Sequence, residues 1–269
     1  METDADVVIS THFMVNEIIS RLKQKNKFNK PLFCAVTDYR LHSFWVASGV
    51  DHYFVPIEDT KQDLIGWGIS ENIITVTGIP IGLKFSQGLD KSTTKVRLRL
   101  NPGLFTVLII GGGFGVGPVE EMVKSIGTIS GDIQLLIVCG YNKELCENVN
   151  KTVFRLNIKS KVFGFIDNVH EFMSASDCLV TKSVGLTTSE AMAKDLPVIF
   201  VKPIPGQESR NADIFASRGA AFIAHDVRTV HKYVKLLFED AGRLDKMRQV
   251  IKTISKSNSA LDIAGRILC

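Results

Sequence analysis

Short apolar runs alternate with stretches of helical periodicity along almost the whole chain, and this alternation restricts the fold more than any other feature. Each run has the length and apolar content of a buried strand, and the intervening stretches are long enough for helices. Strands joined by helices pair in parallel, and parallel sheets are covered on both faces. The chain is therefore predicted to be an α/β protein. The predicted strands are residues 7–10, 32–36, 53–55, 73–77, 105–110, 133–138, 162–166, 178–180, 197–201 and 221–224.

A break in the alternation divides the chain in two. Residues 78–82 contain two glycines and a proline, and a polar, basic stretch follows them. The 269 residues suffice for two domains of ordinary size. The predicted organisation is a Rossmann-like domain over 1–86, a linker over 87–103, a second Rossmann-like domain over 104–256, and a final helix over 257–269 that packs back on the first domain.

Composition excludes several classes of protein. A formal net charge of +4 is too mild for a nucleic-acid-binding protein. No apolar run approaches the roughly 18–20 residues of a membrane span, and the acidic N-terminus does not resemble a signal peptide. The five cysteines lack metal-type spacing, so neither a metal nor a disulfide framework is expected. These features predict a cytoplasmic protein.

A glycine cluster follows the strongest strand, 105–110. Four of the five residues 111–115 are glycines, and Pro118 suits the first turn of a helix. Such a loop lets the backbone approach a phosphate group closely. A dinucleotide fingerprint fails because Val116 replaces its last small residue, and no Walker lysine follows. A phosphate-binding loop is favoured, and the alternative is a turn whose glycines only permit close packing.

A second turn of this kind spans Thr181–Glu190. It joins an apolar strand to a helix, and a helix start presents unpaired N–H groups and a positive dipole to an anion. Glu190 has two possible uses. It could bind a ligand, or it could form a capping box with Thr187.

A third turn, Pro203–Glu208, follows the next strand. Gln207 and Glu208 offer a donor and an acceptor suited to sugar hydroxyls, although an exposed helix start is the simpler interpretation of that pair alone. All three turns would lie at the carboxyl edge of one sheet, where open α/β sheets bind ligands.

These residues resemble the donor-binding half of inverting GT-B glycosyltransferases. The resemblance is closest to the diacylglycerol glycosyltransferases, the monogalactosyldiacylglycerol synthases and processive diacylglycerol glucosyltransferases, and it extends more distantly to MurG-like enzymes. It runs from about Asp4 to about Ala264. The segments that carry it are Phe165–Asn168, Lys182–Ala191, Pro203–Glu208 with Asn211, Val36–Tyr39, His42–Trp45, Val50–Tyr53 and Thr77–Ile81.

The resemblance implies a role for each residue of a UDP-sugar site, with no metal and no cofactor beyond the donor substrate. Glu190 would bind the ribose, and the loop after the first strand would close over the phosphates. Residues 185–188 at the helix start would face the diphosphate through backbone amides and hydroxyls. The backbone near Phe165 would receive the uracil, and Gln207 and Glu208 would bind the hexose. The implied residues are Gly112, Gly113, Phe114, Phe165, Ile166, Lys182, Gly185, Leu186, Thr187, Thr188, Glu190, Gln207 and Glu208.

Two departures from the family pattern stand out. Ser183-Val184 replaces a Pro-Gly or similar small pair, and a β-branched residue restricts the backbone there. The family's opening strand and histidine-bearing glycine loop have no counterpart, so the N-terminal domain is expected to be incomplete. The catalytic base is therefore unassigned. His12, Asp38 and His42 remain as weak candidates, because a lone histidine is more often structural.

The resemblance implies a glycosyltransferase that moves glucose or galactose from UDP to diacylglycerol with inversion. It would act as a peripheral protein at the cytoplasmic face of a membrane. Two alternatives stay open: a non-catalytic relative that only binds UDP-sugar, and a sugar-nucleotide epimerase of the same fold. Membrane contact would fall to the first domain, where Phe13, Phe44 and Trp45 are either exposed or, more simply, part of the core.

Overall fold

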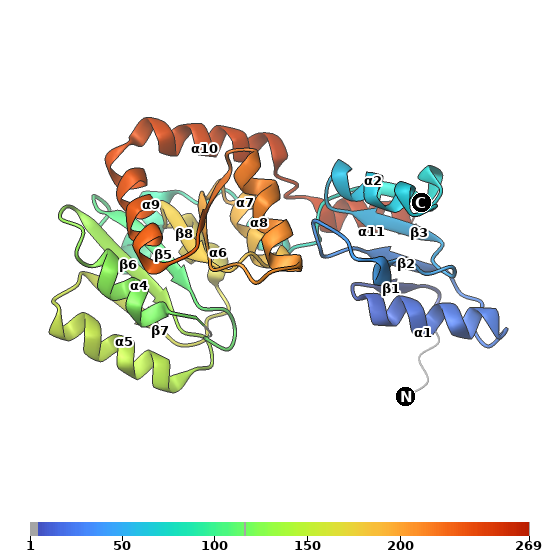
Figure 1. The fold of residues 1–269 in the computed structure, drawn as a ribbon, viewed down its shortest axis with the longest axis horizontal. Helices are drawn as coiled ribbons and strands as arrows, with labels where there is room; N and C mark the ends of the chain where they lie inside the picture. Colours follow the sequence, from blue (N-terminus) through green and yellow to red (C-terminus); the bar gives the residue numbers. More distant parts are fainter. Residues whose placement is uncertain (1–4, 116, 269) are drawn as a thin grey trace. The chain divides into compact units, whose positions relative to one another are not determined.

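The computed structural model describes residues 5–115 and 117–268 and consists of two compact units. The first contains the chain up to Leu83 together with the segment from Lys256 onward, and the second spans Lys84–Ser255. Each unit has one wholly parallel sheet covered by helices (Figure 1). The predicted α/β class with two parallel sheets is confirmed.

The first unit has a four-stranded sheet in the order β1-β2-β3-β4. Its strands are β1 (Val8–Ser10), β2 (Leu32–Ala35), β3 (His52–Val55) and β4 (Ile74–Val76), and its helical segments are α1 (Phe13–Gln24), η1 (Ser43–Trp45), α2 (Glu58–Gly66), η2 (Glu71–Ile73) and α11 (Ser259–Leu268).

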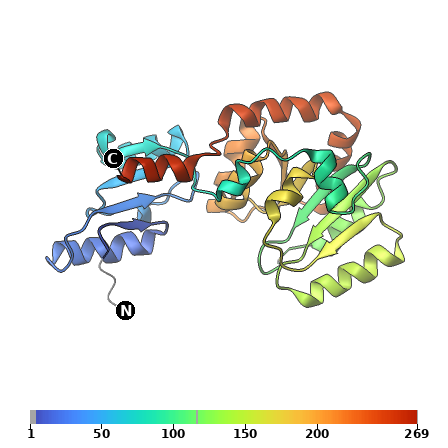
Figure 2. The same cartoon turned by 180° about the vertical axis from the view of Figure 1, so that it is seen from behind.

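Alternation along the strands divides this core between the two faces of the sheet. Cys34 and Tyr53 belong to the cluster that also contains Leu64 of α2, whereas Ala35 and Phe54 pack against Ile263 of α11. Figure 2 shows α11 lying across the strands. The Ser259 Oγ fixes its start by donating to the Ile79 carbonyl at 2.6 Å.

The second unit has a six-stranded sheet in the order β10-β9-β8-β5-β6-β7. Its strands are β5 (Phe105–Ile110), β6 (Ile133–Val138), β7 (Ser160–Phe163), β8 (Cys178–Thr181), β9 (Val198–Val201) and β10 (Ala221–Ala224). The chain leaves β5 towards β6 and β7, then returns to β8 on the other side. This reversal is a topological switch point, the usual place for a ligand in such a sheet.

Helices on both faces bury the strands of the second sheet. The cluster that contains Val107 and Ile109 of β5 packs against Val123 of α4 and Val234 of α9, and on other strands Phe200 contacts Phe215 of α8. The helical segments are η3 (Leu83–Phe85), α3 (Lys91–Arg97), α4 (Val119–Ile126), α5 (Lys143–Arg155), α6 (Val169–Ser174), α7 (Gly185–Ala193), α8 (Gln207–Ser217), α9 (Val227–Glu239) and α10 (Ala241–Ile254).

The segment 87–103, which the sequence predicts to be a linker, contains α3 and belongs to the second unit. The helix begins at Asp90, whose carboxylate accepts the Thr93 N–H at 2.8 Å. Lys95 is buried, and its ammonium donates to the Leu104 carbonyl at 2.6 Å. Polar contacts, not an apolar face, attach α3 to the rest of the second unit. This explains why its sequence shows no apolar periodicity.

Asp177, just before β8, holds three cations at the amino edge of the second sheet. Its carboxylate lies 2.8 Å from Lys91, 3.3 Å from Lys95 and 3.4 Å from Arg248, and it accepts the Thr106 N–H at 2.8 Å. Burial alone would raise the pKa of Asp177, but Lys91, the Thr106 N–H and Lys95 together hold it below its ordinary value. This cluster joins α3 and α10 to the sheet.

Within the described part of the chain, no helix has both the length and the apolar character needed to cross a membrane.

Candidate functional site

The carboxyl edge of the second sheet gathers the turns that the sequence singles out. They follow β5, β8 and β9, which are neighbours around the switch point. A fourth turn, residues 139–142 after β6, lies beside the first of them: the Tyr141 N–H donates to the Gly113 carbonyl at 2.8 Å.

The glycines of this loop differ in what surrounds them. A Cβ on Gly115 would lie 2.5 Å from the Cys139 carbonyl oxygen, and one on Gly111 would lie 3.0 Å from Val119, so these two glycines permit close packing. A Cβ on Gly112 or Gly113 would meet nothing within 4 Å. Gly112 also has a left-handed φ of +76°, which favours glycine.

The open side of the loop therefore offers accessible backbone to a ligand. Phe114, which lies between Gly113 and Gly115, is 81% exposed. Val116, whose side chain argues against a dinucleotide fingerprint, lies outside the described residues.

Helix α7 begins at Gly185, with Val184 as its N-cap. The capping-box interpretation of Thr187 and Glu190 is therefore wrong, because the helix starts before Thr187. The first N–H that bonds within the helix is that of Thr188, which donates to the Val184 carbonyl at 3.0 Å. The N–H groups of Gly185, Leu186 and Thr187 precede it and are the groups that a helix start presents to an anion.

Thr188 needs a correction. Its side chain is fully buried, and its hydroxyl donates to the Val184 carbonyl at 2.8 Å. The expected contact between this hydroxyl and a diphosphate does not fit this geometry, and Thr188 instead secures the first turn of α7.

Ser183 and Val184 fit their positions without the family's small pair. The buried Ser183 hydroxyl donates to the Glu208 carbonyl at 2.6 Å, and Asn211 Nδ2 donates to the Ser183 carbonyl at 3.5 Å. The start of α7 is thereby tied to α8. Val184 has extended backbone, which a β-branched residue adopts readily, and its side chain is exposed.

Two lysines line a small hollow between the ends of β5, β8 and β9 and the start of α4. Its volume is about 180 Å³, and Gly111, Lys182 and Lys202 are among its lining residues. Lys202 has a left-handed φ of +42°, a conformation that costs energy in a residue with a side chain and often marks a functional site. Lys202 is not among the residues predicted from the sequence, although its place directly after β9 at this edge could have indicated it.

Glu190 lies on α7, about one and a half turns from the start of the helix. Burial raises the pKa of its carboxyl to about 7, and the charge of Lys84 opposes that rise. Among the described residues its carboxylate makes no hydrogen bond and no ion pair. A half-buried carboxylate without a hydrogen-bond partner can accept hydrogen bonds from the hydroxyl groups of a ligand.

The third turn places Gln207 and Glu208 at the first residues of α8, after Gly206 with a φ of +112°. The Glu208 carboxylate accepts the Ile204 N–H at 3.1 Å and stiffens the turn. Both side chains lie at the carboxyl edge of the sheet.

Phe165 and Ile166 follow β7, which ends at Phe163 and not at residue 166 as predicted. Phe165 is 57% exposed, whereas Ile166 is half-buried. The Phe165 ring stacks on the Tyr141 ring, with centroids 4.4 Å apart and an interplanar angle of 10°.

The three candidate bases lie in the first unit and differ in what they contact. His12 caps α1, because its Nδ1 accepts the Met14 N–H at 3.3 Å, and the buried Asp38 accepts the Trp45 Nε1–H at 3.0 Å. The buried Nδ1 of His42 has no hydrogen-bond partner among the described residues. The His42 ring is instead packed among aromatic residues, with Phe13 and Phe44 at centroid distances of 4.8 and 5.4 Å.

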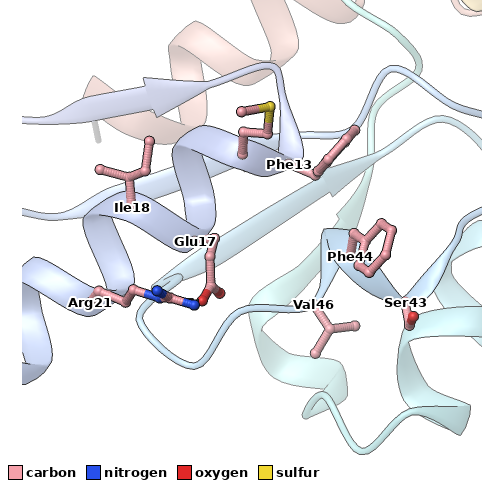
Figure 3. A pocket seen from close by; sticks show the side chains of 8 residues that line it. Phe13, Glu17, Ile18, Arg21, Ser43, Phe44 and Val46 are labelled. Carbon is pink, nitrogen blue, oxygen red and sulfur yellow. Dashed lines mark hydrogen bonds and ion pairs between the residues drawn. The ribbon is translucent and has the colours of Figure 1, made fainter.

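An apolar hollow of about 580 Å³ lies in the first unit (Figure 3), and two of its lining residues, Phe13 and Phe44, also pack against the His42 ring. It separates α1 from the η1 segment, and its lining residues are Phe13, Met14, Glu17, Ile18, Arg21, Ser43, Phe44 and Val46. Phe44 is 70% exposed, and Met14 and Ile18 are also exposed. The prediction of a core role thus fits Trp45, which is 1% exposed, but not Phe44.

Comparison with known proteins identifies the relatives of this chain. Residues 1–81 match the family model of monogalactosyldiacylglycerol (MGDG) synthase, and residues 90–256 match that of glycosyl transferases group 1. The processive diacylglycerol beta-glucosyltransferase of Bacillus cytotoxicus is 33% identical over 264 residues, covering 98% of this chain and 67% of the relative. The protein of the same name from Bacillus subtilis is 31% identical over 268 residues, covering 99% and 69%. The chain thus spans about two thirds of the length of these relatives.

Solved structures show the same fold. MurG of Acinetobacter baumannii superposes with a TM-score of 0.74 at 14% identity, covering 98% of this chain and 73% of the other. Anabaena Alr3699/HepE in complex with UDP gives 0.65 at 13% identity, covering 98% and 79%. The chain therefore belongs to the diacylglycerol glycosyltransferase family, that of the MGDG synthases and processive diacylglycerol glucosyltransferases, and has the GT-B fold.

Proposed function

We propose that this protein transfers a hexosyl group, glucose or galactose, from a UDP-sugar to diacylglycerol with inversion. The observation that carries the proposal is the arrangement at the carboxyl edge of the second sheet, where an open helix start, an open glycine loop and an unpartnered carboxylate occur together. The relatives named diacylglycerol glucosyltransferases support the reaction class.

Each part of a UDP-sugar has a matching group at this edge. The N–H groups of Gly185–Thr187 and the backbone of Gly112 and Gly113 suit the diphosphate, with Lys182 and Lys202 beside them. Glu190 suits the ribose hydroxyls, and Gln207 with Glu208 suits the hexose. Amides fixed before the reaction stabilise the negative charge that grows on the departing diphosphate.

The reaction requires one proton transfer. A base removes the proton of the acceptor hydroxyl while its oxygen attacks the anomeric carbon from the face opposite the diphosphate. The bond from that carbon to the diphosphate oxygen breaks, and UDP leaves with the electron pair.

We further propose that the hollow between α1 and η1 faces the lipid. Its exposed apolar side chains share the hollow with Arg21, which pairs with Glu17 at 2.6 Å, and the exposed Lys25 and Lys27 follow just past the end of α1. Apolar contact together with basic residues is typical of a surface that binds an anionic membrane reversibly. This arrangement would hold the protein at the membrane that contains its acceptor.

Replacing Phe44 by serine should weaken binding to vesicles of anionic lipid and diacylglycerol about tenfold, because inserting one phenyl ring into lipid is worth about 1.5–3 kcal/mol. Vesicle sedimentation measures the effect. Phe154→Ser is the matched control, since Phe154 is 89% exposed on α5 of the second unit. If Phe44→Ser sediments with the vesicles as the wild type does, the proposal that the hollow faces the lipid is wrong.

Transfer of hexose from UDP-glucose or UDP-galactose to diacylglycerol in vesicles tests the function as a whole. The assay also separates the enzyme from the two alternatives, since a non-catalytic relative would only bind UDP and an epimerase would change the sugar without lipid product.

A further inference from the structure

Tyr141 is an exposed aromatic residue that neither the family resemblance nor the sequence pattern assigns to the site. It lies in the 139–142 turn after β6 and is 64% exposed. An exposed aromatic ring at this edge of the sheet has a face on which a planar ligand can stack.

The backbone of this turn is locked to the glycine loop. The Tyr141 N–H donates to the Gly113 carbonyl at 2.8 Å, and Asn142 Nδ2 donates to the Gly115 carbonyl at 3.4 Å. The contact is so close that a Cβ on Gly140 would lie 2.3 Å from the Gly113 carbonyl oxygen. The turn therefore fixes the inner side of the loop that we assign to the phosphates.

The side chain of the same residue reaches the opposite neighbour. The Tyr141 ring stacks on Phe165 at 4.4 Å with an angle of only 10°, and the Cys139 N–H bonds the Phe163 carbonyl at 2.8 Å. Tyr141 thus connects two parts of the site: its backbone bonds to the glycine loop, and its ring stacks on Phe165.

We propose that Tyr141 is a positioning residue for the nucleobase. This inference rests on the proposed function. Both rings of the stacked pair are more than half exposed, and a planar base gains free energy by stacking on such an aromatic surface. By holding the Phe165 ring at a fixed distance from the glycine loop, Tyr141 sets the spacing between base and diphosphate and favours ligands that span it.

Calorimetry with UDP and with inorganic pyrophosphate tests the role. Tyr141→Ala should raise the dissociation constant for UDP about five- to tenfold, the scale of one aromatic pair, and change that for pyrophosphate less than twofold. The backbone N–H that holds the glycine loop is retained in this variant. Tyr141→Phe keeps the ring and should bind UDP as the wild type does.

Phe154→Ala controls for the loss of an exposed ring. It lies near the far end of α5, about 17 Å along the helix from residue 143. It should bind both ligands as the wild type does. Far-UV circular dichroism checks that every variant is folded.

The outcomes separate the two claims. Wild-type affinity for UDP in Tyr141→Ala overturns the positioning role and leaves the proposed function standing. An equal loss of UDP and pyrophosphate binding also overturns it, because the residue would then act on the phosphates. A wild-type protein that binds pyrophosphate but not UDP overturns the proposed function and the positioning role together.

Discussion

Replacing Glu190 by alanine is expected to weaken UDP binding about 100-fold while leaving the protein folded. A carboxylate that accepts two ribose hydroxyls makes hydrogen bonds worth about 1.5–3 kcal/mol each, and part of that energy is recovered by water in the variant. A net loss of about 3 kcal/mol corresponds to roughly 100-fold in affinity. Isothermal titration calorimetry with UDP measures it.

The pH dependence of the same titration gives an independent check. Because burial raises the pKa of Glu190 to about 7, the free protein takes up a proton as the pH falls from 8 to 6. The neutral carboxyl is a weaker acceptor, so UDP affinity should fall about tenfold over this range. In Glu190→Gln the part of the pH dependence that comes from the carboxyl should be absent, and only the part that comes from titration of the UDP phosphate should remain.

Stability distinguishes ribose binding from a purely structural role. A carboxyl whose folded pKa exceeds its unfolded value stabilises the fold below the unfolded pKa, and that contribution is lost as the pH rises through about 7. At pH 8 the Glu190→Gln protein should therefore be at least as stable as the wild type. If Glu190→Gln has a lower melting temperature than the wild type and still binds UDP with wild-type affinity, the role of Glu190 is structural only.

Replacing Asp177 by alanine is expected to cost about 3–5 kcal/mol of folding free energy, because it leaves Lys91, Lys95 and Arg248 without their shared carboxylate. In a domain of this size the loss should lower the melting temperature by roughly 10 °C. Thermal denaturation followed by circular dichroism measures the change.

The sign of the pH effect at Asp177 is opposite to that at Glu190. Its folded pKa is lowered, so its stabilisation is fully present above the unfolded value of 3.8 and is lost as the pH falls through the lower folded value. Asp245→Ala is the control, since Asp245 also pairs with Arg248 but its side chain is 70% exposed. A control variant as unstable as Asp177→Ala would contradict the assignment of the stabilisation to the buried cluster.

The sequence predicts the two sheets and the turns at the carboxyl edge of the second sheet well, because these depend on patterns that can be read in a single chain. Apolar runs indicate the strands, and the glycines at 111–115 and the turn at 181–190 indicate the loops around the switch point. Helix α3 was missed because its lysines are satisfied by Asp177, which lies about 80 residues away in the sequence. A pattern of neighbouring residues cannot indicate an ion pair between residues so far apart in the sequence.

The finer errors at the site have a similar cause. The Thr187–Glu190 spacing matches a capping box, but the backbone of Val184 starts the helix and the Thr188 hydroxyl is used within it. The sequence does not single out Tyr141 or Lys202, because the Phe165 ring and the hollow that these residues meet are formed by segments that follow other strands. A sequence motif names the residue types, and the tertiary fold decides which side chains remain free for a ligand.

The most direct test of the proposed function is the formation of labelled lipid from UDP-[¹⁴C]glucose or UDP-[¹⁴C]galactose and vesicle diacylglycerol. The proposed function predicts a labelled monohexosyl lipid of inverted anomeric configuration with the wild-type protein, and about 100-fold less with Glu190→Ala at subsaturating donor. A wild-type protein that binds UDP and yields no labelled lipid from either donor would contradict it.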